Sequence, residues 1–250
     1  MSYDFRESKK RVIDELTTKT KIGPVVNPTD NKLTYENGAR SWISAIFVDI
    51  RKSTEYFKNT SDDIIARTLR AFSSELIKIM KDGAKYLQIG LRGDCVYAVY
   101  PTPNKSDIVE VFRVAYRINA FMKMLRVLLE QKNMPTIEAG IGLGVGNDLV
   151  IKAGDNGSGI NDIIWIGDAV VDASNNSDRA KKEVTSEIVM SNLFYTNIIE
   201  ILSEENPEYK EWISNKKSGS YYGYSQTLPY YHCSIVQSNF SDWIDKGFSE

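Results

Sequence analysis

The 250-residue sequence is poor in the residues on which several common kinds of site depend. It contains one histidine, His232, which excludes His-rich zinc sites and leaves a His-dependent triad with a single residue near the C-terminus. The two cysteines, Cys95 and Cys233, are far apart and fit a reducing cytosol better than a disulfide framework. We therefore expect any chemistry to use carboxylates and oxygen-preferring metal ions.

Long apolar runs and blocks of like charge are also missing. No apolar stretch approaches the roughly 20 residues that span a bilayer, and the charged start, MSYDFRESKKRVIDEL, does not resemble a signal peptide. The 31 basic and 33 acidic residues are mixed along the chain, so nothing favours a nucleic-acid or membrane surface. These absences predict a cytoplasmic protein that binds neither nucleic acid nor membrane.

The periodicity of apolar residues predicts an N-terminal helix and extended arm over 1–40, followed by one domain over 41–250. Within that domain the first six elements alternate as strand, helix, strand, strand, helix, strand. This order is typical of a ferredoxin-like βαββαβ core, an α+β fold with an antiparallel sheet and helices on one face. The predicted elements are a strand at Trp42–Val48, a helix from Ser61 to Gly83, a hairpin of Tyr86–Leu91 and Cys95–Tyr100, a helix around 111–129 and a strand at Ile137–Val145.

A longer C-terminal part extends this core. We expect strands at Leu149–Ala153 and Asp162–Ile166 around the turn GDNGSG, then the helix Asp168–Lys182, the strand Ile188–Met190, the helix Asn192–Leu202 and a closing strand at Tyr230–Gln237. No structure or role is predicted for 203–228. Glycines at 140, 142, 144 and 146 alternate along a strand, which favours a small-residue interface or a bend over a phosphate loop, since no Lys-Ser/Thr follows them.

The first strand ends in the segment IFVDIRKST, in which the carboxylate of Asp49 directly follows an apolar run. Burying a carboxylate is costly unless something compensates its charge. The expected topology makes the strand of Asp49 a neighbour of the hairpin that carries Asp94, so the two carboxylates can converge. Paired carboxylates with a main-chain carbonyl between them suit Mg²⁺. The alternative is that Asp49 caps a turn and Asp94 occupies an ordinary hairpin.

The loop after Asp49 offers backbone N–H groups and short polar side chains that suit a triphosphate. Lys152 is a second candidate for a phosphate contact, and the alternative for it is a solvent-facing lysine on a strand. The loop residues concerned are Arg51, Lys52, Ser53 and Thr54.

Three segments, FVDIRKST, RGDCVYAVY and IWIGDAVVDAS, resemble the signature segments of class III nucleotidyl cyclases. The resemblance covers about 41–182. It implies a palm-like catalytic domain in which the ribose 3′-OH attacks the α-phosphate of the same nucleoside triphosphate and pyrophosphate leaves. It also implies two Mg²⁺ or Mn²⁺ ions per site, held by Asp49, the carbonyl of Ile50, and Asp94.

The second and third segments are similar, more narrowly, to the bacterial Pycsar pyrimidine cyclases, which make cyclic UMP or cyclic CMP in anti-phage defence. The two base-reading positions of purine cyclases fall on Gly90 and Ile164, neither of which carries a purine-selecting group. Arg92 shares a strand face with Asp94 and can hold a phosphate or a pyrimidine O2 carbonyl, or it only pairs with a carboxylate.

The third segment departs from the parent class. The Asn and Arg that stabilise the transferring phosphate there fall on Val171 and Asn175. Asp172 or Asn175 can hydrogen-bond the ribose, and Arg179, one turn further along, is the candidate for the missing cation. Losing one preorganised donor lowers the rate of catalysis by roughly 10²–10³. A slow enzyme and an inactive one are therefore both alternatives.

The resemblance further implies a homodimer with composite sites, with metal ligands from one protomer and residues 164–179 from its partner. The sequence therefore predicts a soluble enzyme that cyclises UTP or CTP, whose product is read by a separate cyclic-nucleotide-binding effector. The alternatives are a purine or relaxed-specificity cyclase and an inactive nucleotide-binding sensor dimer.

Overall fold

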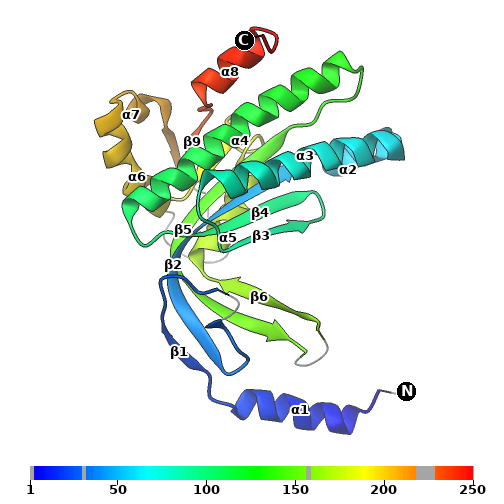
Figure 1. Cartoon of the computed structure of the whole chain (residues 1–250), viewed down its shortest axis with the longest axis vertical. Coiled ribbons are helices and arrows are strands. Elements are labelled where there is room, and N and C mark those ends of the chain that lie inside the picture. The colour runs from blue at the N-terminus through cyan, green and yellow to red at the C-terminus, as the bar shows by residue number, and fades with distance from the viewer. Residues whose placement is uncertain (1–2, 30–31, 156–158, 218–228, 250) are drawn as a thin grey trace.

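One twisted sheet organises the molecule (Figure 1). The computed structural model describes residues 3–29, 32–155, 159–217 and 229–249. Within these residues the strands lie in the order β3-β4-β2-β5-β7-β9-β8, with β1 beside β2 and β6 beside β5. Their bounds are β1 Lys21–Pro24, β2 Asn37–Ile50, β3 Gln88–Arg92, β4 Cys95–Pro101, β5 Ala139–Gly154, β6 Asn161–Ile166, β7 Ile188–Met190, β8 Ser214–Lys217 and β9 Pro229–Cys233.

The main core lies on one face of this sheet, under helices α3 (Asp62–Gly83) and α4 (Lys105–Gln131). The side chains of β2 alternate, so Ile46, Val48 and Ile50 are buried against these helices. Phe47 and Asp49 therefore project from the opposite face. The same alternation that builds the core thus places a carboxylate on the functional face.

Helix α5 (Asp168–Arg179) covers part of that opposite face, above the four alternating glycines of β5. A Cβ on Gly142 would overlap the carbonyl oxygen of Ala173 and the backbone nitrogen of Ser177. A Cβ on Gly140, Gly144 or Gly146 would also meet atoms of α5 or its flanking residues. Of the two predicted explanations, an interface or a bend, the structure shows the small-residue interface, and α5 is the element that packs on it.

The predicted βαββαβ order is confirmed, and the pairing β5-β2-β4-β3 is that of a ferredoxin-like core. The predicted break between the strands at 137–145 and 149–153 is wrong, because β5 runs without interruption from Ala139 to Gly154. Gly146, Asn147 and Asp148 stay paired with β2. The buried Asp148 carboxylate accepts hydrogen bonds from the N–H groups of the first turn of α5, so it is a cap and not part of a turn.

Two C-terminal expectations also need correction, and part of the segment without a prediction has regular structure. Helix α5 ends at Arg179, three residues early, and Lys181 then takes a left-handed conformation with φ of 59°. The closing strand is only Pro229–Cys233, and α8 (Ser238–Asp245) follows where no helix is predicted. Part of 203–228 is ordered as the end of α6 (Asn192–Glu205), α7 (Tyr209–Trp212) and β8, while 218–228 lies outside the described residues.

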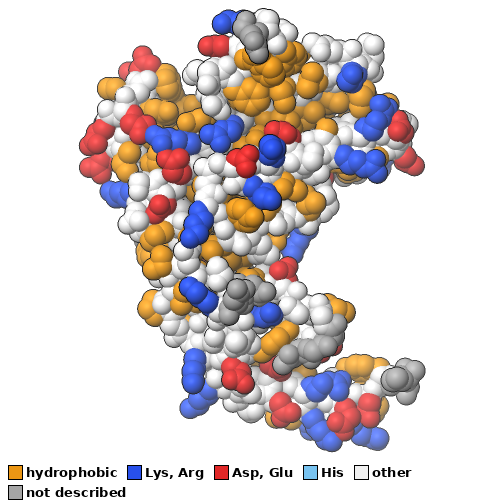
Figure 2. Space-filling view, in the orientation of Figure 1, with side chains coloured by type: hydrophobic (Ala, Val, Ile, Leu, Met, Phe, Trp, Pro, Cys, Tyr) orange, Lys and Arg blue, Asp and Glu red, His pale blue; other side chains and the backbone are white. Residues whose placement is uncertain are grey.

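The N-terminal helix α1 (Phe5–Thr17) stands apart from the body and has no buried residue, and a short helix α2 (Ser53–Asn59) follows β2 (Figure 1). Basic and acidic side chains alternate over the face shown in Figure 2, as their mixing along the sequence predicts. None of the helices in the described part of the chain is both long enough and apolar enough to span a membrane.

Candidate active site

Asp49 lies near the end of β2, opposite Cys95 on β4 and Gly140 on β5. Asp94 precedes Cys95 in the β3–β4 turn, so the two predicted carboxylates lie on adjoining strands. Burial raises the pKa of Asp49, the Arg51 guanidinium opposes that rise, and the charges of Asp94 and Asp178 add to it. Because Asp94 directly precedes the strand partner of Asp49, the sheet places the two aspartates near each other, as predicted.

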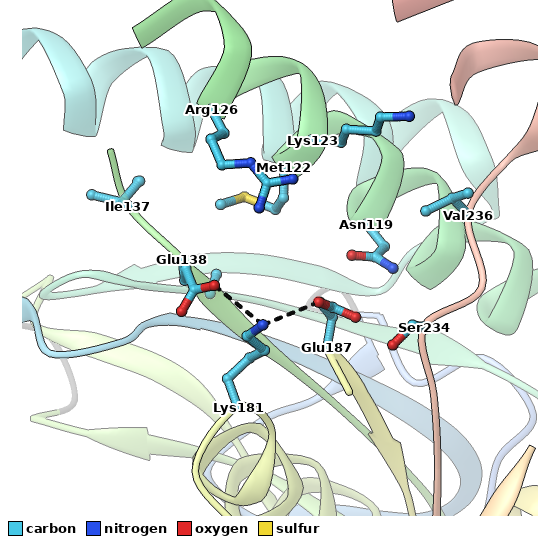
Figure 3. Close-up of a pocket in the computed structure, with 11 residues that line it drawn as sticks. Asn119, Met122, Lys123, Arg126, Ile137, Glu138, Lys181, Glu187, Ser234 and Val236 are labelled. Carbon is cyan, nitrogen blue, oxygen red and sulfur yellow. Dashed lines mark hydrogen bonds and ion pairs between the residues drawn. The ribbon is translucent and has the colours of Figure 1, made fainter. Parts of the chain in front are cut away.

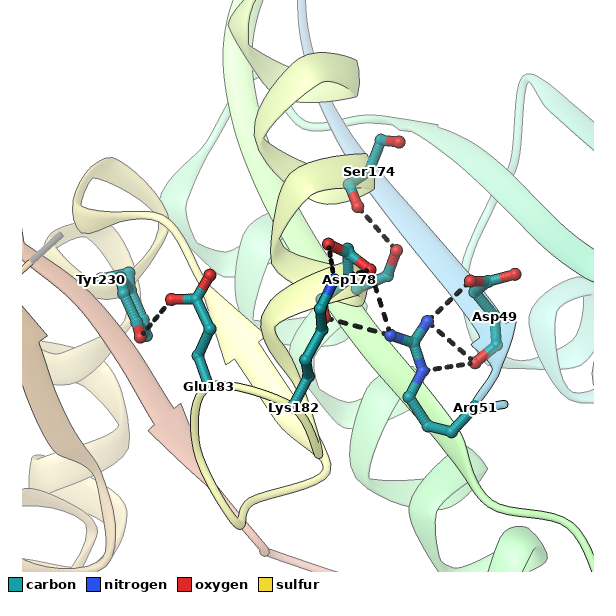
Figure 4. Close-up of polar contacts among 8 residues, drawn as sticks. Asp49, Arg51, Ser174, Asp178, Lys182, Glu183 and Tyr230 are labelled. Atoms are coloured by element: carbon teal, nitrogen blue, oxygen red, sulfur yellow. Dashed lines mark hydrogen bonds and ion pairs between the residues drawn. The ribbon is translucent and has the colours of Figure 1, made fainter. Parts of the chain in front are cut away.

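Arg51 forms an ion pair with Asp49 in this structure (Figure 4). Its Nη2 lies 2.6 Å from Oδ2 of Asp49, and its Nη1 donates to the backbone carbonyl of Asp178 at 3.0 Å. The Asp178 carboxylate is in turn paired with Lys182, Nζ to Oδ2 2.9 Å. Arg51 therefore ties the end of β2 to α5, and its side chain is only 11% exposed.

The loop after Asp49 forms one side of a pocket of about 1040 Å³. Lys52 adopts the left-handed conformation, with φ of 52°, and helix α2 begins at Ser53. The other side comes from 135–138 and from Asp178, Lys181 and Lys182. All the loop residues predicted to bind phosphate line this pocket, together with Asp49 and Ile50: Arg51, Lys52, Ser53 and Thr54.

Lys181 separates this pocket from a smaller one of about 190 Å³ beneath α4 (Figure 3). Its Nζ lies 3.1 Å from Oε1 of Glu138 and 3.3 Å from Oε1 of Glu187. The N–H of Arg51 donates to the carbonyl of Glu138 at 2.8 Å. Lys181 therefore braces the backbone beside the loop that carries Arg51.

Another pocket at Asp49, of about 530 Å³, runs toward β6, and we call it the second pocket. It contains Arg92 and Ile164, so one of the two predicted base-reading positions lies in the same hollow as the metal-ligand candidate. The other position, Gly90, lies opposite Tyr97, which also lines the pocket. The pocket thus joins Asp49 to the predicted base-binding region within one protomer.

The residues of α5 that were predicted to contact ribose or phosphate lie outside the pocket at Asp49. Arg179 donates to Oδ1 of Asn176 at 2.9 Å and its guanidinium lies 4.8 Å from the ring centre of Tyr230 on β9. Burial, with the Asp168 charge as the next cause, raises the pKa of Asp172 to about 6. Val171 is 55% exposed and Asn175 is half-buried. The structure does not bring these residues onto the Asp49 carboxylate of the same protomer.

Lys152 is also remote from Asp49. It lies on β5 twelve positions beyond Gly140, which pairs with Asp49, and this corresponds to about 40 Å of extended strand. Within one protomer, Lys152 therefore does not contact the pocket at the end of β2.

Two residues of the site, Asp178 and Tyr97, were not predicted from the sequence. Asp178 faces Arg51 because α5 folds back over the sheet, which the sequence periodicity does not reveal. Tyr97 could have been found, because a two-residue turn at Gly93 and Asp94 pairs Arg92 with Cys95 and hence Gly90 with Tyr97.

The donors at the end of β2 fit a hard divalent cation. The set would be the carboxylates of Asp49 and Asp94 and the carbonyl of Ile50, with water and phosphate completing the shell. In the part of the chain that the structure describes, no three His, Cys, Asp or Glu side chains gather into a metal site. Burial raises the pKa of Asp49, and the negative charges of Asp94 and Asp178 add to that rise. A bound cation would relieve the repulsion among these carboxylates.

Two curated proteins are similar to this chain over most of its length. One is a uridylate cyclase from Treponema porcinum, 42% identical over 249 residues, which are 99% of this chain and 82% of that protein. Another is a uridylate cyclase from Gulbenkiania mobilis, 32% identical over 231 residues, which are 88% of this chain and 90% of that protein. No protein-family model matches the chain.

The fold is similar to that of solved cyclases. The adenylyl cyclase CyaB from P. aeruginosa superposes with a TM-score of 0.61 over 80% of this chain and 97% of that one, at 21% identity. At this identity the likeness concerns the fold, and the two uridylate cyclases carry the family assignment. The chain belongs to the uridylate cyclase family, has the catalytic-domain fold of class III nucleotidyl cyclases, and is a nucleotide cyclase.

Proposed function

We propose that this nucleotide cyclase converts UTP to 3′,5′-cyclic UMP and pyrophosphate. The observation that carries the proposal is the base end of the second pocket, where Gly90 and Ile164 replace the purine-reading side chains of the parent class. The uridylate cyclases to which the chain is similar support uracil over cytosine. CTP is the nearest alternative, since it presents a ring of the same size.

In the proposed reaction the ribose 3′-oxygen forms a bond to the α-phosphorus, and the bond from that phosphorus to the oxygen bridging to the β-phosphate breaks. The 3′-hydroxyl proton passes to solvent water, and pyrophosphate carries away the electron pair of the broken bond. Asp49, Asp94 and the Ile50 carbonyl would hold Mg²⁺ or Mn²⁺, which supplies charge neutralisation at the phosphates when bound. Backbone N–H groups and hydroxyls of the loop 51–54 bind the triphosphate.

Arg51 has two roles in this proposal. Without substrate its guanidinium neutralises Asp49, as the 2.6 Å contact in the structure indicates. With a cation bound at Asp49, Arg51 would be free to bind phosphate in the pocket that it already lines. Arginine suits both partners because its planar fork binds carboxylates and phosphates alike.

We propose that the working form is a homodimer with two composite sites. The residues proposed to contact ribose and phosphate from α5 do not reach Asp49 within one protomer, so a second copy must supply them. Apolar side chains exposed beside the second pocket suit such a contact: Ile164 is 42% exposed, Ile166 48% and Val171 55%. Exposed apolar side chains gathered on adjoining elements mark interaction surfaces.

The test uses pure protein with each of UTP, CTP, ATP and GTP and either Mg²⁺ or Mn²⁺, with the products identified by mass. We expect cyclic UMP as the main product and a loss of at least ~100-fold in rate for Asp49→Ala, which removes a ligand candidate. Asp62→Ala, an exposed acidic residue in the first turn of α3, is the matched control. Cyclic AMP or GMP as the only product would refute the proposal.

A second candidate function is a nucleotide sensor without turnover. It is favoured by Arg51 on Asp49, by Arg179 over Tyr230, and by Val171 and Asn175 in place of the parent Asn and Arg. Binding of UTP with no product under any metal condition would support the sensor.

The proposed biological role is a second messenger for anti-phage defence, with the product read by a separate effector. Its support is the likeness to the pyrimidine cyclases alone. Cells carrying the intact gene with its effector should resist phage, and cells carrying Asp49→Ala should not.

A further inference from the structure

The base end of the second pocket has an aromatic wall beside Gly90. The pairing of β3 with β4 sets Gly90 directly opposite Tyr97. A Cβ placed on Gly90 would lie 2.5 Å from Cε1, Cζ and the phenol oxygen of Tyr97. The phenol ring therefore lies over Gly90 and fills the space that any longer side chain at this position would need.

Packing fixes the orientation of this ring. Phe47, the β2 partner of Tyr97, stacks against it with ring centres 5.3 Å apart and planes inclined by 19°. Both rings line the pocket that begins at Asp49. A ring held by a stacked neighbour and a strand pairing has little freedom to turn aside for a ligand.

Hydrogen bonds fix the opposite wall of the pocket as well. Trp165 Nε1 donates to Oε1 of Gln88 at 2.5 Å, and Nε2 of Gln88 donates to Oδ1 of Asp162 at 3.1 Å. These bonds join β3 to β6 across the base end of the pocket. The distance between the two walls is therefore set by the protein and not by the ligand.

The phenol is also a neutral hydrogen-bonding group. Burial raises the pKa of Tyr97, the charge of Asp162 adds to this rise, and Arg92 opposes it, so the hydroxyl keeps its proton at neutral pH. None of the hydrogen bonds found among the described residues uses its oxygen. The hydroxyl can therefore donate to, or accept from, a ring edge in the pocket.

We propose that Tyr97 is a specificity-determining residue, which narrows the base pocket to a single-ring base and hydrogen-bonds to its edge. This rests on the proposed function, because it assumes that the nucleotide base enters the pocket between Tyr97 and Ile164. Gly90 is then the residue that makes room for the phenol. The purine-reading side chain of the parent class and this phenol would exclude one another.

The test compares Tyr97→Ala, Tyr97→Leu and Tyr97→Phe, with Tyr86→Ala, a 40% exposed residue just before β3, as the control. The four triphosphates are supplied together at equal concentration, and the ratio of purine to pyrimidine products is measured by mass. Tyr97→Ala should raise that ratio at least ~10-fold, the size of effect that one added or removed group has in a shaped pocket. Tyr97→Phe should keep the ratio and lower kcat/KM for UTP about 5-fold.

Affinities of non-hydrolysable UTP and ATP analogues, measured by calorimetry on the same variants, make the test independent of turnover. An unchanged ratio of ATP to UTP affinity in Tyr97→Ala, with a wild-type melting temperature, would overturn the inference. Tyr97→Leu retains apolar bulk beside Phe47, so it gives the answer if the alanine variant is unfolded. Wild-type protein that binds UTP selectively without cyclising it would refute the proposed function and leave the role of Tyr97 standing.

Discussion

At the scale of single residues, the site is governed by which positive charge neutralises Asp49. Its carboxylate is 34% exposed and lies near two other aspartates, while Arg51 is the cation that contacts it. A metal ion that binds Asp49, as proposed, would therefore compete with a guanidinium that is already bound, and that competition would depend on pH because only the ionised carboxylate binds either partner.

Replacing Arg51 by methionine should strengthen Mn²⁺ binding at neutral pH. Arg51 lowers the pKa of Asp49 against the effects of burial, Asp94 and Asp178, so its guanidinium opposes any second positive charge at this carboxylate. A divalent ion gains about twice as much as a proton from the loss of a neighbouring positive charge, so the metal competes better in the variant. Mn²⁺ titrations followed by electron paramagnetic resonance would measure the dissociation constant.

Arg126→Met is the matched control, because Arg126 lines the separate pocket beneath α4 (Figure 3). Its Mn²⁺ affinity should stay at the wild-type value. A wild-type Mn²⁺ affinity in Arg51→Met would mean that the guanidinium does not govern the charge of Asp49.

The two metal-ligand candidates were predictable because each depends on local signals. An apolar run ending in an aspartate predicts Asp49, and a two-residue turn predicts the position of Asp94. Asp178 was not predictable, since its contact with Arg51 depends on where a helix more than a hundred residues later packs. Periodicity assigns a residue to a face of its own element and does not say which other element covers that face.

At the scale of elements, the contact of α5 with β5 positions the third sequence segment over the sheet. The helix backbone approaches the strand so closely that only glycine fits beneath it. The four glycines at alternate positions were recognisable in the sequence as an interface, but their partner was not. The uninterrupted course of β5 was missed for a related reason, because Asp148 resembles a turn residue and acts as the cap of α5.

Gly142→Ala should lower the free energy of unfolding by about 3 kcal/mol, the upper end of the range for overpacked sites. The added methyl would meet backbone atoms of Ala173 and Ser177, which cannot move without shifting the whole helix. Gly23→Ala on β1 is the control, since nothing lies within 4 Å of its Cβ position, and it should stay within about 0.5 kcal/mol of wild type. Urea unfolding curves of both variants would decide; equal stabilities would show that α5 is loosely packed.

Two aspartates of α5 should respond to pH with opposite signs. Burial raises the pKa of Asp172 to about 6, so the folded protein loses stability as pH rises through that value. Asp172→Asn should therefore be more stable than wild type at pH 7, by about 1–2 kcal/mol, and lose this advantage toward pH 4. Hydrogen bonds from Lys182 lower the pKa of Asp178, so Asp178→Asn should be less stable than wild type at pH 7 and approach it as pH falls.

The measurement for both variants is the melting temperature from pH 4 to pH 8, roughly the range over which a raised and a lowered carboxylate differ. Parallel curves for wild type and Asp172→Asn would show that burial does not hold Asp172 in its neutral form.

At the scale of the whole molecule, the proposed site is incomplete within one protomer. The end of β2 carries the metal-ligand candidates and the pocket proposed for phosphate, whereas Val171, Asp172 and Asn175 lie on α5 away from them. The proposed two-fold dimer would complete two such sites, because each protomer would give its α5 to the other and receive one in return. No sequence pattern within a single chain specifies such an arrangement, which is why it entered only through the resemblance to class III cyclases.

The proposed dimer can be tested separately from the folding of the protomer. Val171→Asp should shift the protein from dimer to monomer in sedimentation analysis and lower turnover at least ~10-fold, because a charge at the centre of a packed contact costs several kcal/mol. The protomer itself should melt normally, since Val171 is 55% exposed in it. Leu193→Asp on α6, also an exposed apolar residue at 41%, should stay dimeric and active. Full activity in a monomeric Val171→Asp protein would mean that one protomer carries a whole site, and the roles assigned to α5 would then have to be sought within the same chain.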